Sequence, residues 1–180
     1  YGDAAVANSG YTVNSLYNGV ALTGVTCTTT YAAGNHAGDT TQTTSCSGNT
    51  NGDYNVTKYN DGAVSITAKD VTVTANGDSY IYGEAVHGDK GYTVEGLYNG
   101  IDVTGVTCST TYVQGNHVSN TTRTTFCSGN TNTDYNVTDY FTGSITITPK
   151  NVTVTANGHD YTYGDAAVAN SGYTVNSLYN

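Results

Sequence analysis

Apolar and hydroxyl-bearing residues alternate in several short stretches of the chain. Every second residue is apolar in Val71–Ala75, and Val64–Ile66 follows the same two-residue period. Such a period places successive side chains on opposite faces of a β-strand. No stretch shows a helical period, and Ser15–Gly19 accommodates at most one helical turn before its glycine. The pattern therefore predicts an all-β fold built from short strands.

The two halves of a predicted hairpin occur twice along the chain. Tyr54–Tyr59 and Ala63–Thr67 are strand-like runs on either side of the glycine-containing turn Asn60–Gly62. Tyr135–Tyr140 and Ser144–Thr148 repeat the arrangement. A short turn of this kind between two strand-like runs is typical of a β-hairpin. We therefore expect each of the two pairs to form one.

The buried positions change parity between neighbouring strand-like stretches. Val64 and Ile66 occupy even positions, whereas Val71 and Val73 occupy odd ones. In one unbroken strand these two pairs would point to opposite faces. We expect the chain to leave the core of one module and enter the next through the short linker Thr67–Asp70, which predicts modules stacked end to end in an extended rod.

A fixed period organises the whole sequence. Its first eighteen residues return unchanged as Tyr163–Asn180, and a diverged version begins at Tyr82. Tyr1–Asp70 and Tyr82–Asn151 align without gaps and share 42 of 70 residues. Self-similarity at a constant step is the sequence signature of a tandem array. The unchanged return after 162 residues (163 minus 1) predicts one continuous polypeptide made of many two-module units.

The period also predicts the module boundaries. We expect a first module over 1–70 that lacks its opening strand, a complete second module over 71–151, and the start of a third over 152–180. Modules of this length fold with thin cores. The predicted architecture is a row of small immunoglobulin-like β-sandwiches, and a β-grasp-like module is the alternative.

Composition narrows the function classes. The net charge is −9 at pH 7 and only 11% of residues are charged, which argues against nucleic acid or an anionic membrane as partner. No apolar run reaches the length of a membrane span. Aliphatic residues are few, but 17 tyrosines supply area to bury and favour a folded chain over a disordered one.

Each module carries two cysteines that lie 19 residues apart. Four cysteines allow three pairings, and the matched spacing favours Cys27 with Cys46 and Cys108 with Cys127. Each such disulfide would contribute roughly 3 kcal/mol to stability. Buried free thiols are the alternative, and zinc is disfavoured because close C-x-x-C spacing is absent. Disulfides would indicate an oxidising, exported setting.

Two histidines recur in the loop between the cysteine-containing stretches. His36 and His117 each follow Gly-Asn. A metal site would need acidic neighbours, and Asp39 lies near His36, whereas Ser119 and Asn120 take that place in the other module. We therefore expect an exposed loop here and not a metal site.

Acidic residues recur at two positions of the repeat, at Asp3, Glu84 and Asp165 and at Asp53 and Asp134. Carboxylate oxygens suit Ca²⁺, so a calcium ion at the module junctions is one interpretation, and no other cofactor is expected. Turn formation, in which these side chains bond nearby backbone, is the other. No nucleophile lies at a telling spacing from a base, so the sequence predicts no enzyme.

The order of short motifs resembles a known family. The chain contains in succession V-T-V-T-A-N-G, Y-x-Y-G-D/E, G-Y-T-V-x-x-L-Y-N-G, D-Y-N-V-T and G-S-I-T-I-T-P-K. This order is similar to the MBG (YGX-type) and YDG repeats of bacterial surface adhesins, and it covers Val71–Asn151 fully and both flanks in part. The resemblance implies a large exported protein of β-rich modules with a stalk or adhesive role. The regular cysteine pair departs from the family's pattern.

These observations lead to two hypotheses about function. The first is a structural repeat region of an extracellular bacterial fibre or adhesin stalk, at the cell surface or in a biofilm matrix. Its partners would be neighbouring modules, other copies of the fibre, or a host or surface ligand. The second is a set of modules that each hold glycan or protein weakly and gain affinity through multivalency.

Overall fold

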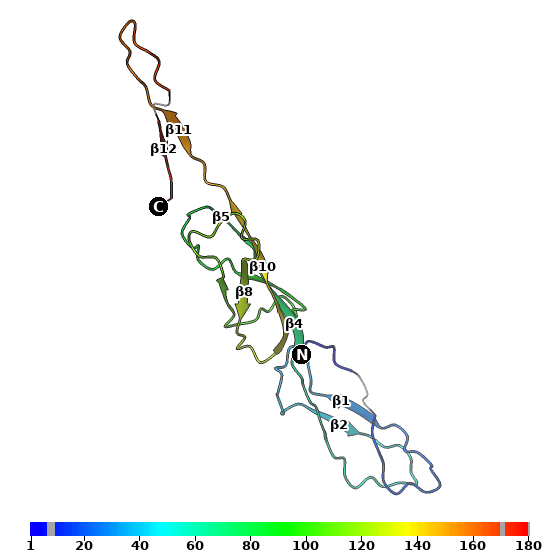
Figure 1. The fold of residues 1–180 in the computed structure, drawn as a ribbon. Coiled ribbons are helices and arrows are strands. Elements are labelled where there is room, and N and C mark those ends of the chain that lie inside the picture. The colour runs from blue at the N-terminus through cyan, green and yellow to red at the C-terminus, as the bar shows by residue number, and fades with distance from the viewer. Residues whose placement is uncertain (7–9, 170–171, 180) are drawn as a thin grey trace. The chain divides into compact units, whose positions relative to one another are not determined.

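The computed structural model describes residues 1–6, 10–169 and 172–179, and over these residues the fold is all-β without a helix (Figure 1). The predicted fold class is therefore confirmed at this level. The strands of the described residues are β1 (Thr26–Thr29), β2 (Thr43–Ser47), β3 (Gly62–Ala63), β4 (Lys69–Ala75), β5 (Asp78–Ile81), β6 (Tyr92–Glu95), β7 (Thr107–Thr110), β8 (Thr124–Ser128), β9 (Tyr135–Phe141), β10 (Gly143–Thr148), β11 (Thr153–Ala156) and β12 (Tyr173–Asn176).

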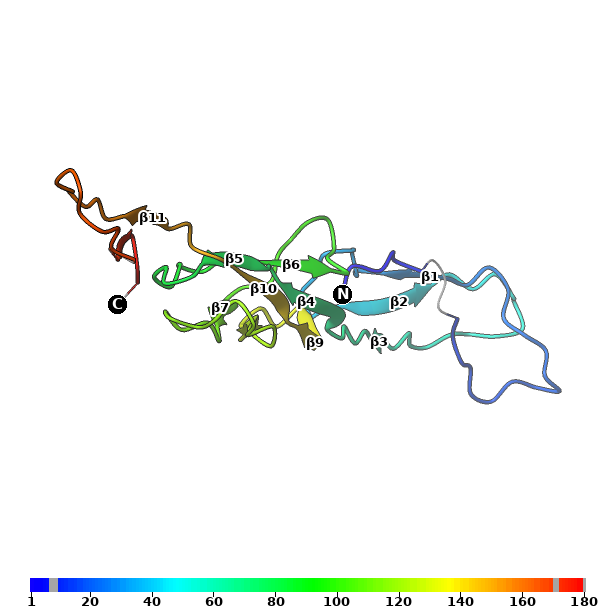
Figure 2. The same ribbon diagram turned by 45° about the horizontal axis from the view of Figure 1, so that its top comes forward.

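The strands form four small sheets. Their orders are β1-β2-β3, β5-β10-β8-β7, β6-β4-β9 and β11-β12. β1 pairs antiparallel with β2, whereas β10 runs parallel to β5 and antiparallel to β8. In Figure 2, β4 lies beside β6 and β9. The immunoglobulin-like sandwich and the rod remain predictions.

The chain divides into two compact units. Unit 1 contains Tyr1–Val73, Val94–Val106 and Ser128–Tyr140, and unit 2 contains Thr74–Thr93, Thr107–Cys127 and Phe141–Asn180. Each unit therefore takes segments from more than one module of the sequence period. The three modules remain useful as names for the repeated sequence, and we use them in that sense below.

Tyrosines build the core of unit 2. The rings of Tyr80 and Tyr112 stack with 3.7 Å between their centroids. They pack with Ile145 and Ile147, which alternate with exposed residues along β10. The Tyr112 hydroxyl donates to the backbone oxygen of Glu84 at 2.8 Å. A thin core is thus stabilised by large rings whose polar ends find partners.

A second tyrosine cluster lies in unit 1. Tyr1 packs edge-on against Tyr98, with 5.3 Å between the centroids, and against Tyr135 at 5.6 Å. The Tyr135 hydroxyl accepts a hydrogen bond from Tyr98 N–H and donates to the Ile101 oxygen. Tyr1 and Tyr135 are buried. The first tyrosine of the repeat is therefore a core residue here.

Both expected disulfides are present. Cys27 and Cys46 lie directly opposite each other on β1 and β2, with 4.0 Å between their Cα atoms. Cys108 and Cys127 link β7 and β8 at the same Cα separation. A short separation of this kind is typical of the non-hydrogen-bonded positions of an antiparallel pair, where side chains lie closest. No described cysteine is free.

The two predicted hairpins do not form. Tyr54–Tyr59 is not a strand. β9 and β10 are strands, as expected, but they belong to different sheets. A Cβ atom on Gly143 would lie 2.5 Å from the backbone oxygen of Ala75, so only glycine allows this close approach. Pairing with the earlier strands β4 and β5 has outcompeted the local hairpin.

The change of parity at the linker corresponds to a break in the strand. Ile66 and Val71 are both buried although their positions differ in parity. Residues 64–68 between β3 and β4 lie outside any strand. The bounds differ from the prediction, because residues 64–66 were expected in a strand and are irregular, whereas Lys69 and Asp70 of the expected linker belong to β4.

Candidate functional site

A tyrosine contact recurs with the period of the sequence. Tyr1 of the first module packs edge-on against Tyr98 of the second, and Tyr82 of the second packs edge-on against Tyr179 of the third, with centroids 5.3 Å and 5.7 Å apart. Adding 81 to each member of the first pair gives the second pair. Successive modules are therefore joined by the same contact within each compact unit.

The glycine that follows each of these tyrosines is required by the contact. Gly2 and Gly83 have φ of +84° and +83°. A Cβ on Gly2 would lie 2.6 Å from the ring of Tyr98, and a Cβ on Gly83 would lie 2.6 Å from the ring of Tyr179. Both the backbone conformation and the space therefore exclude a larger residue without rearrangement.

A histidine and a buried carboxylate form a second link between modules. His36 Nδ1 lies 2.7 Å from Asp134 Oδ2, and Ala37 N–H donates to Asp134 Oδ1 at 2.7 Å. The Asp134 side chain is 6% exposed, whereas that of His36 is 81% exposed. We call this pair the His36–Asp134 clip. The pairing was not predicted from the sequence, because 98 positions separate the two residues.

The clip has an electrostatic consequence. The hydrogen bond to Asp134, together with the charge of that carboxylate, raises the pKa of His36 above its ordinary value. The imidazolium form is therefore favoured by the fold. The counterparts of the pair in the repeat, His117 and Asp53, have no such partner among the described residues. The ring of His117 stacks on Tyr82 instead.

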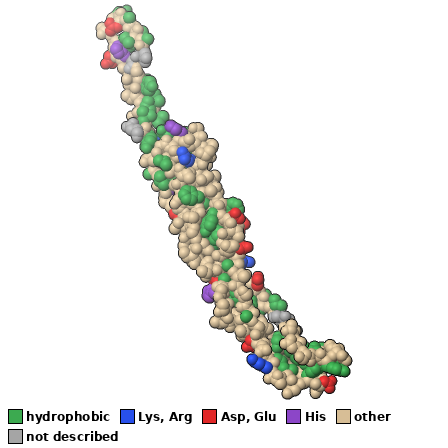
Figure 3. Space-filling view, turned by 60° about the horizontal axis from the view of Figure 1, so that its bottom comes forward, with side chains coloured by type: hydrophobic (Ala, Val, Ile, Leu, Met, Phe, Trp, Pro, Cys, Tyr) green, Lys and Arg blue, Asp and Glu red, His purple; other side chains and the backbone are tan. Residues whose placement is uncertain are grey.

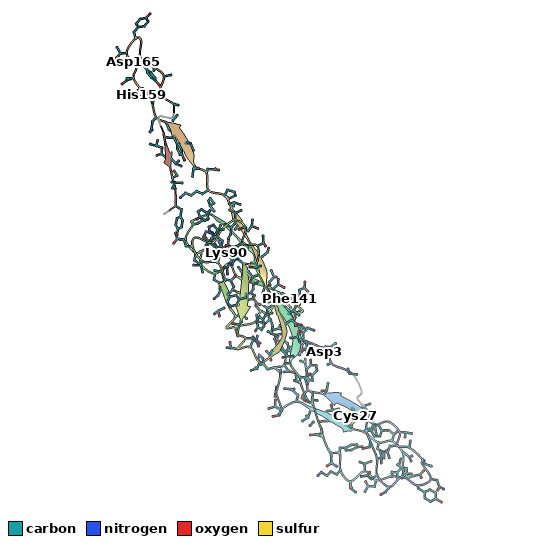
Figure 4. All side chains as sticks on the ribbon, viewed as in Figure 1. Asp3, Cys27, Lys90, Phe141, His159 and Asp165 are labelled. Atoms are coloured by element: carbon teal, nitrogen blue, oxygen red, sulfur yellow. A yellow bond between two sulfur atoms is a disulfide. The ribbon has the colours of Figure 1, made fainter. Side chains whose placement is uncertain are left out.

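Two of the candidate calcium ligands accept hydrogen bonds from backbone N–H groups. Glu84 Oε2 accepts the N–H of Ile81, and Asp165 Oδ2 accepts the N–H of Thr162, each at 2.7 Å. These bonds close the turns that the alternative interpretation predicted. Figure 4 shows Asp165 and His159 on the loop between β11 and β12.

The remaining acidic candidates lie in different surroundings. Asp134 belongs to the clip, Asp53 is exposed, and Asp3 contributes its backbone oxygen to the Tyr31 hydroxyl. Over the described part of the chain, no three His, Cys, Asp or Glu side chains gather as a metal site would require. The calcium site at these five residues therefore stays a prediction.

A second histidine lies in a charged cluster of unit 2. His87 Nδ1 is 2.9 Å from Asp78 Oδ2, and His87 Nε2 is 3.2 Å from Glu84 Oε1. Lys90 Nζ lies 3.7 Å from Asp78 Oδ1. The hydrogen bond to Glu84, followed by that to Asp78, raises the pKa of His87. These residues satisfy one another, and Asp78, His87 and Lys90 border a hollow of about 300 Å³.

Asp78 is stabilised in its ionised form. Burial acts to raise its pKa, but hydrogen bonds from Ser79 N–H and from His87 outweigh burial, so the pKa of Asp78 is lowered. The same carboxylate supports the ring of His87 above Tyr80, where the two rings stack at 4.3 Å. The cluster therefore folds the loop after β5 against the tyrosine core.

An open groove lies in the first module. It has a volume of about 790 Å³ and is lined mainly by residues 10–14 and 54–63, with Leu16, Leu22 and Val25 among its apolar lining residues. All of these residues belong to unit 1. The groove was not predicted from the sequence.

The surface carries few charges. The face drawn in Figure 3 is dominated by uncharged polar side chains and backbone, with scattered acidic and basic groups. This agrees with the low charged fraction of 11%. Within the described residues, no helix is long and apolar enough to cross a membrane.

Comparisons with family models, with curated proteins and with solved structures found no match to this chain. The resemblance to MBG and YDG repeats therefore stays a prediction from the motifs.

Proposed function

We propose that the chain is a structural repeat region of a large extracellular bacterial fibre or adhesin stalk. The observation that carries the proposal is the recurring tyrosine contact, because Tyr1–Tyr98 and Tyr82–Tyr179 join successive modules in the same way. A contact that returns with the sequence period suits an array of modules that resists tension. A scaffold of this kind needs repetition more than a diversity of sites.

The cysteine chemistry supports an exported location. Two disulfides in 180 residues, with no free described cysteine, are expected in an oxidising compartment. In a fibre under tension each disulfide also keeps about 19 residues from extending, which shortens the unfolded length by roughly 65 Å per module. The motif order that resembles surface-adhesin repeats points in the same direction.

A multivalent binding role is the second candidate. The hollow beside His87, with Asp78 and Lys90 in its wall, is the feature that favours it. A ligand there would have to compete with existing ion pairs, so weak binding multiplied over many modules is the expected mode. Loss of glycan or protein binding in Lys90→Ala, whose half-exposed side chain lies 3.7 Å from Asp78, with an unchanged denaturation midpoint, would favour this role.

Antibodies against the 180-residue chain provide the test. On intact, unpermeabilised cells of the source we expect labelling along surface filaments, and reduced denaturing gels of native material should show a chain far larger than 18.7 kDa. Labelling that appears only after permeabilisation would contradict the extracellular location. A single reduced band near the size of this chain would contradict the long array.

A further inference from the structure

The hollow of about 300 Å³ in unit 2 lies beside the loop that joins β5 to β6. Residues 86–91 of this loop and residues 108–110 of β7 supply most of its lining. Lys90 projects from the same loop (Figure 4). All lining residues belong to the second module, which has neighbouring modules on both sides in the sequence. The hollow is therefore a feature of a complete module.

The charges of the hollow occur in only one of the two module versions. Four charged or titratable side chains line it, and adding 81 to their numbers gives a different residue each time: Asp78 becomes His159, His87 becomes Val168, Asp89 becomes Asn170 and Lys90 becomes Ser171. The uncharged lining residues Asn76, Tyr80 and Gly91 are the same in both versions. The versions share the scaffold and differ in the charges, which indicates that the charges do more than build the module.

A buried carboxylate and a half-exposed ammonium group lie next to each other in the hollow. The side chain of Asp78 is 8% exposed, and its Oδ1 atom lies 3.7 Å from Lys90 Nζ. This distance is too long for a hydrogen bond, so the Lys90 ammonium group does not donate to Asp78. The side chain of Lys90 is 42% exposed and reaches solvent at the same time.

One hydroxyl group of a ligand can bridge these two charges. An oxygen placed about 2.8 Å from both atoms completes a triangle whose third side is the 3.7 Å between Asp78 Oδ1 and Lys90 Nζ. It would accept a hydrogen bond from Lys90 and donate one to Asp78, and a neutral hydroxyl does both. An anion would meet the like charge of Asp78, and a cation would meet that of Lys90. The pair therefore favours an uncharged ligand.

The rest of the lining fits a ring that carries several hydroxyl groups. Asp89 Oδ1 accepts the N–H of Gly91 at 2.6 Å, whereas Oδ2 has only a long bond of 3.3 Å from the N–H of Cys108. Each carboxylate oxygen has two lone pairs, so Oδ2 can accept a further bond. Val86 is 51% exposed and adds an apolar wall. Hydroxyl groups at the edge of a sugar ring and C–H groups on its face match these two surfaces.

We propose that the hollow binds a neutral sugar unit of a glycan, with one hydroxyl bridging Lys90 and Asp78 and another donating to Asp89. The volume lies at the small end of ligand pockets, which suits a single sugar unit. The inference rests on the second candidate function, to which it gives a site and a ligand class. The site belongs to one module version, so it recurs once in each two-module unit and gains affinity through multivalency.

Nuclear magnetic resonance of the isotopically labelled 180-residue chain tests the proposal. D-glucose, D-galactose, D-mannose and N-acetyl-D-glucosamine serve as neutral probes at tens of millimolar. We expect at least one of them to shift the amide signals of residues 87–91 and 108–110 in a saturable manner. Lys90→Ser installs the residue of the other module version, and it should weaken that binding about tenfold because a charged hydrogen-bond donor is lost.

Lys150→Ser is the matched control, because Lys150 is also exposed but lies outside the hollow, and it should bind like the wild type. Both variants should keep the wild-type urea midpoint. The proposal is overturned if none of the four sugars shifts these signals, if Lys90→Ser binds equally well, or if acetate or methylammonium produces the same shifts. The multivalent role itself stands if Lys90→Ala removes binding of a protein instead, and the fibre function depends on neither result.

Discussion

Val71–Ala75 and Val152–Ala156 have the same sequence and opposite surroundings. In β4, Val73 is 0% exposed, whereas its equivalent Val154 is 60% exposed in β11. Strand propensity is identical for the two, and both form strands. The difference is in the neighbouring strands, because β4 lies between β6 and β9, whereas β11 pairs with β12 alone among the described strands. Packing partners, and not local sequence, therefore decide burial here.

The largest effect should come from a charge introduced into one member of this pair. Val73→Asp places an unpaired carboxylate in a fully buried position and should cost about 3 kcal/mol or more of unfolding free energy. Val154→Asp should cost about 0.5 kcal/mol or less, measured at a concentration where the chain is monomeric. Urea denaturation measures both effects. Equal shifts of the midpoint in the two variants would contradict the difference in burial between the two valines.

Removing each disulfide in turn compares the stability of the first and second modules. Replacing Cys27 and Cys46 with serine should cost about 3 kcal/mol, and so should replacing Cys108 and Cys127. The structural result should differ, because β8 pairs with β10, which is itself paired with β5, whereas β2 pairs with β3, which ends its sheet among the described strands. We expect hydrogen exchange to show loss of β1 and β2 in the first double variant and retention of β8 in the second.

Gly83→Ala tests the contact that recurs between modules. Its φ of +83° and the nearby ring of Tyr179 should make the variant less stable by about 1–2 kcal/mol. Gly88→Ala is the control, because nothing lies within 4 Å of its added Cβ and its φ is not positive. Thermal denaturation that showed equal shifts for both variants would remove the steric argument.

The smallest effect concerns the pH dependence of the His36–Asp134 clip. The hydrogen bond to Asp134 raises the pKa of His36, so the stabilisation is fully present below the unfolded pKa of about 6.5. It is lost as the pH rises through the higher folded pKa. The urea midpoint of the wild type should therefore fall more across this window than that of His36→Gln. His117→Gln, which removes a ring without a carboxylate partner, should keep the wild-type pH dependence.

The alternation of Val71–Ala75 and the matched cysteines were sufficient to predict strands and disulfides. Both signals are local, since a two-residue period describes one strand and the cysteine pairs lie within one module. The stacking of Tyr80 on Tyr112 was not predictable in detail, but the abundance of tyrosine indicated that rings would build the core.

Contacts that cross from one module to the next were not predictable. Nothing in the sequence near His36 identifies Asp134, 98 residues away, as its partner. The hairpin prediction for β9 and β10 was wrong for the same reason, because each strand found a better partner in an earlier strand. The sequence period implies self-contained modules, whereas each compact unit is built from more than one module.

Hydrogen exchange of the two identical strands measures whether packing partners or the strand sequence determine their stability. Peptides covering residues 69–77 and 150–158 differ in their second residue, Asp70 against Asn151, so mass spectrometry can follow both in one sample of the monomeric chain. The account predicts that the Val73 amide exchanges at least about a hundredfold more slowly than the Val154 amide, a difference of about 2.7 kcal/mol in local opening. Equal rates would show that the strand sequence itself determines its stability, and they would contradict the account.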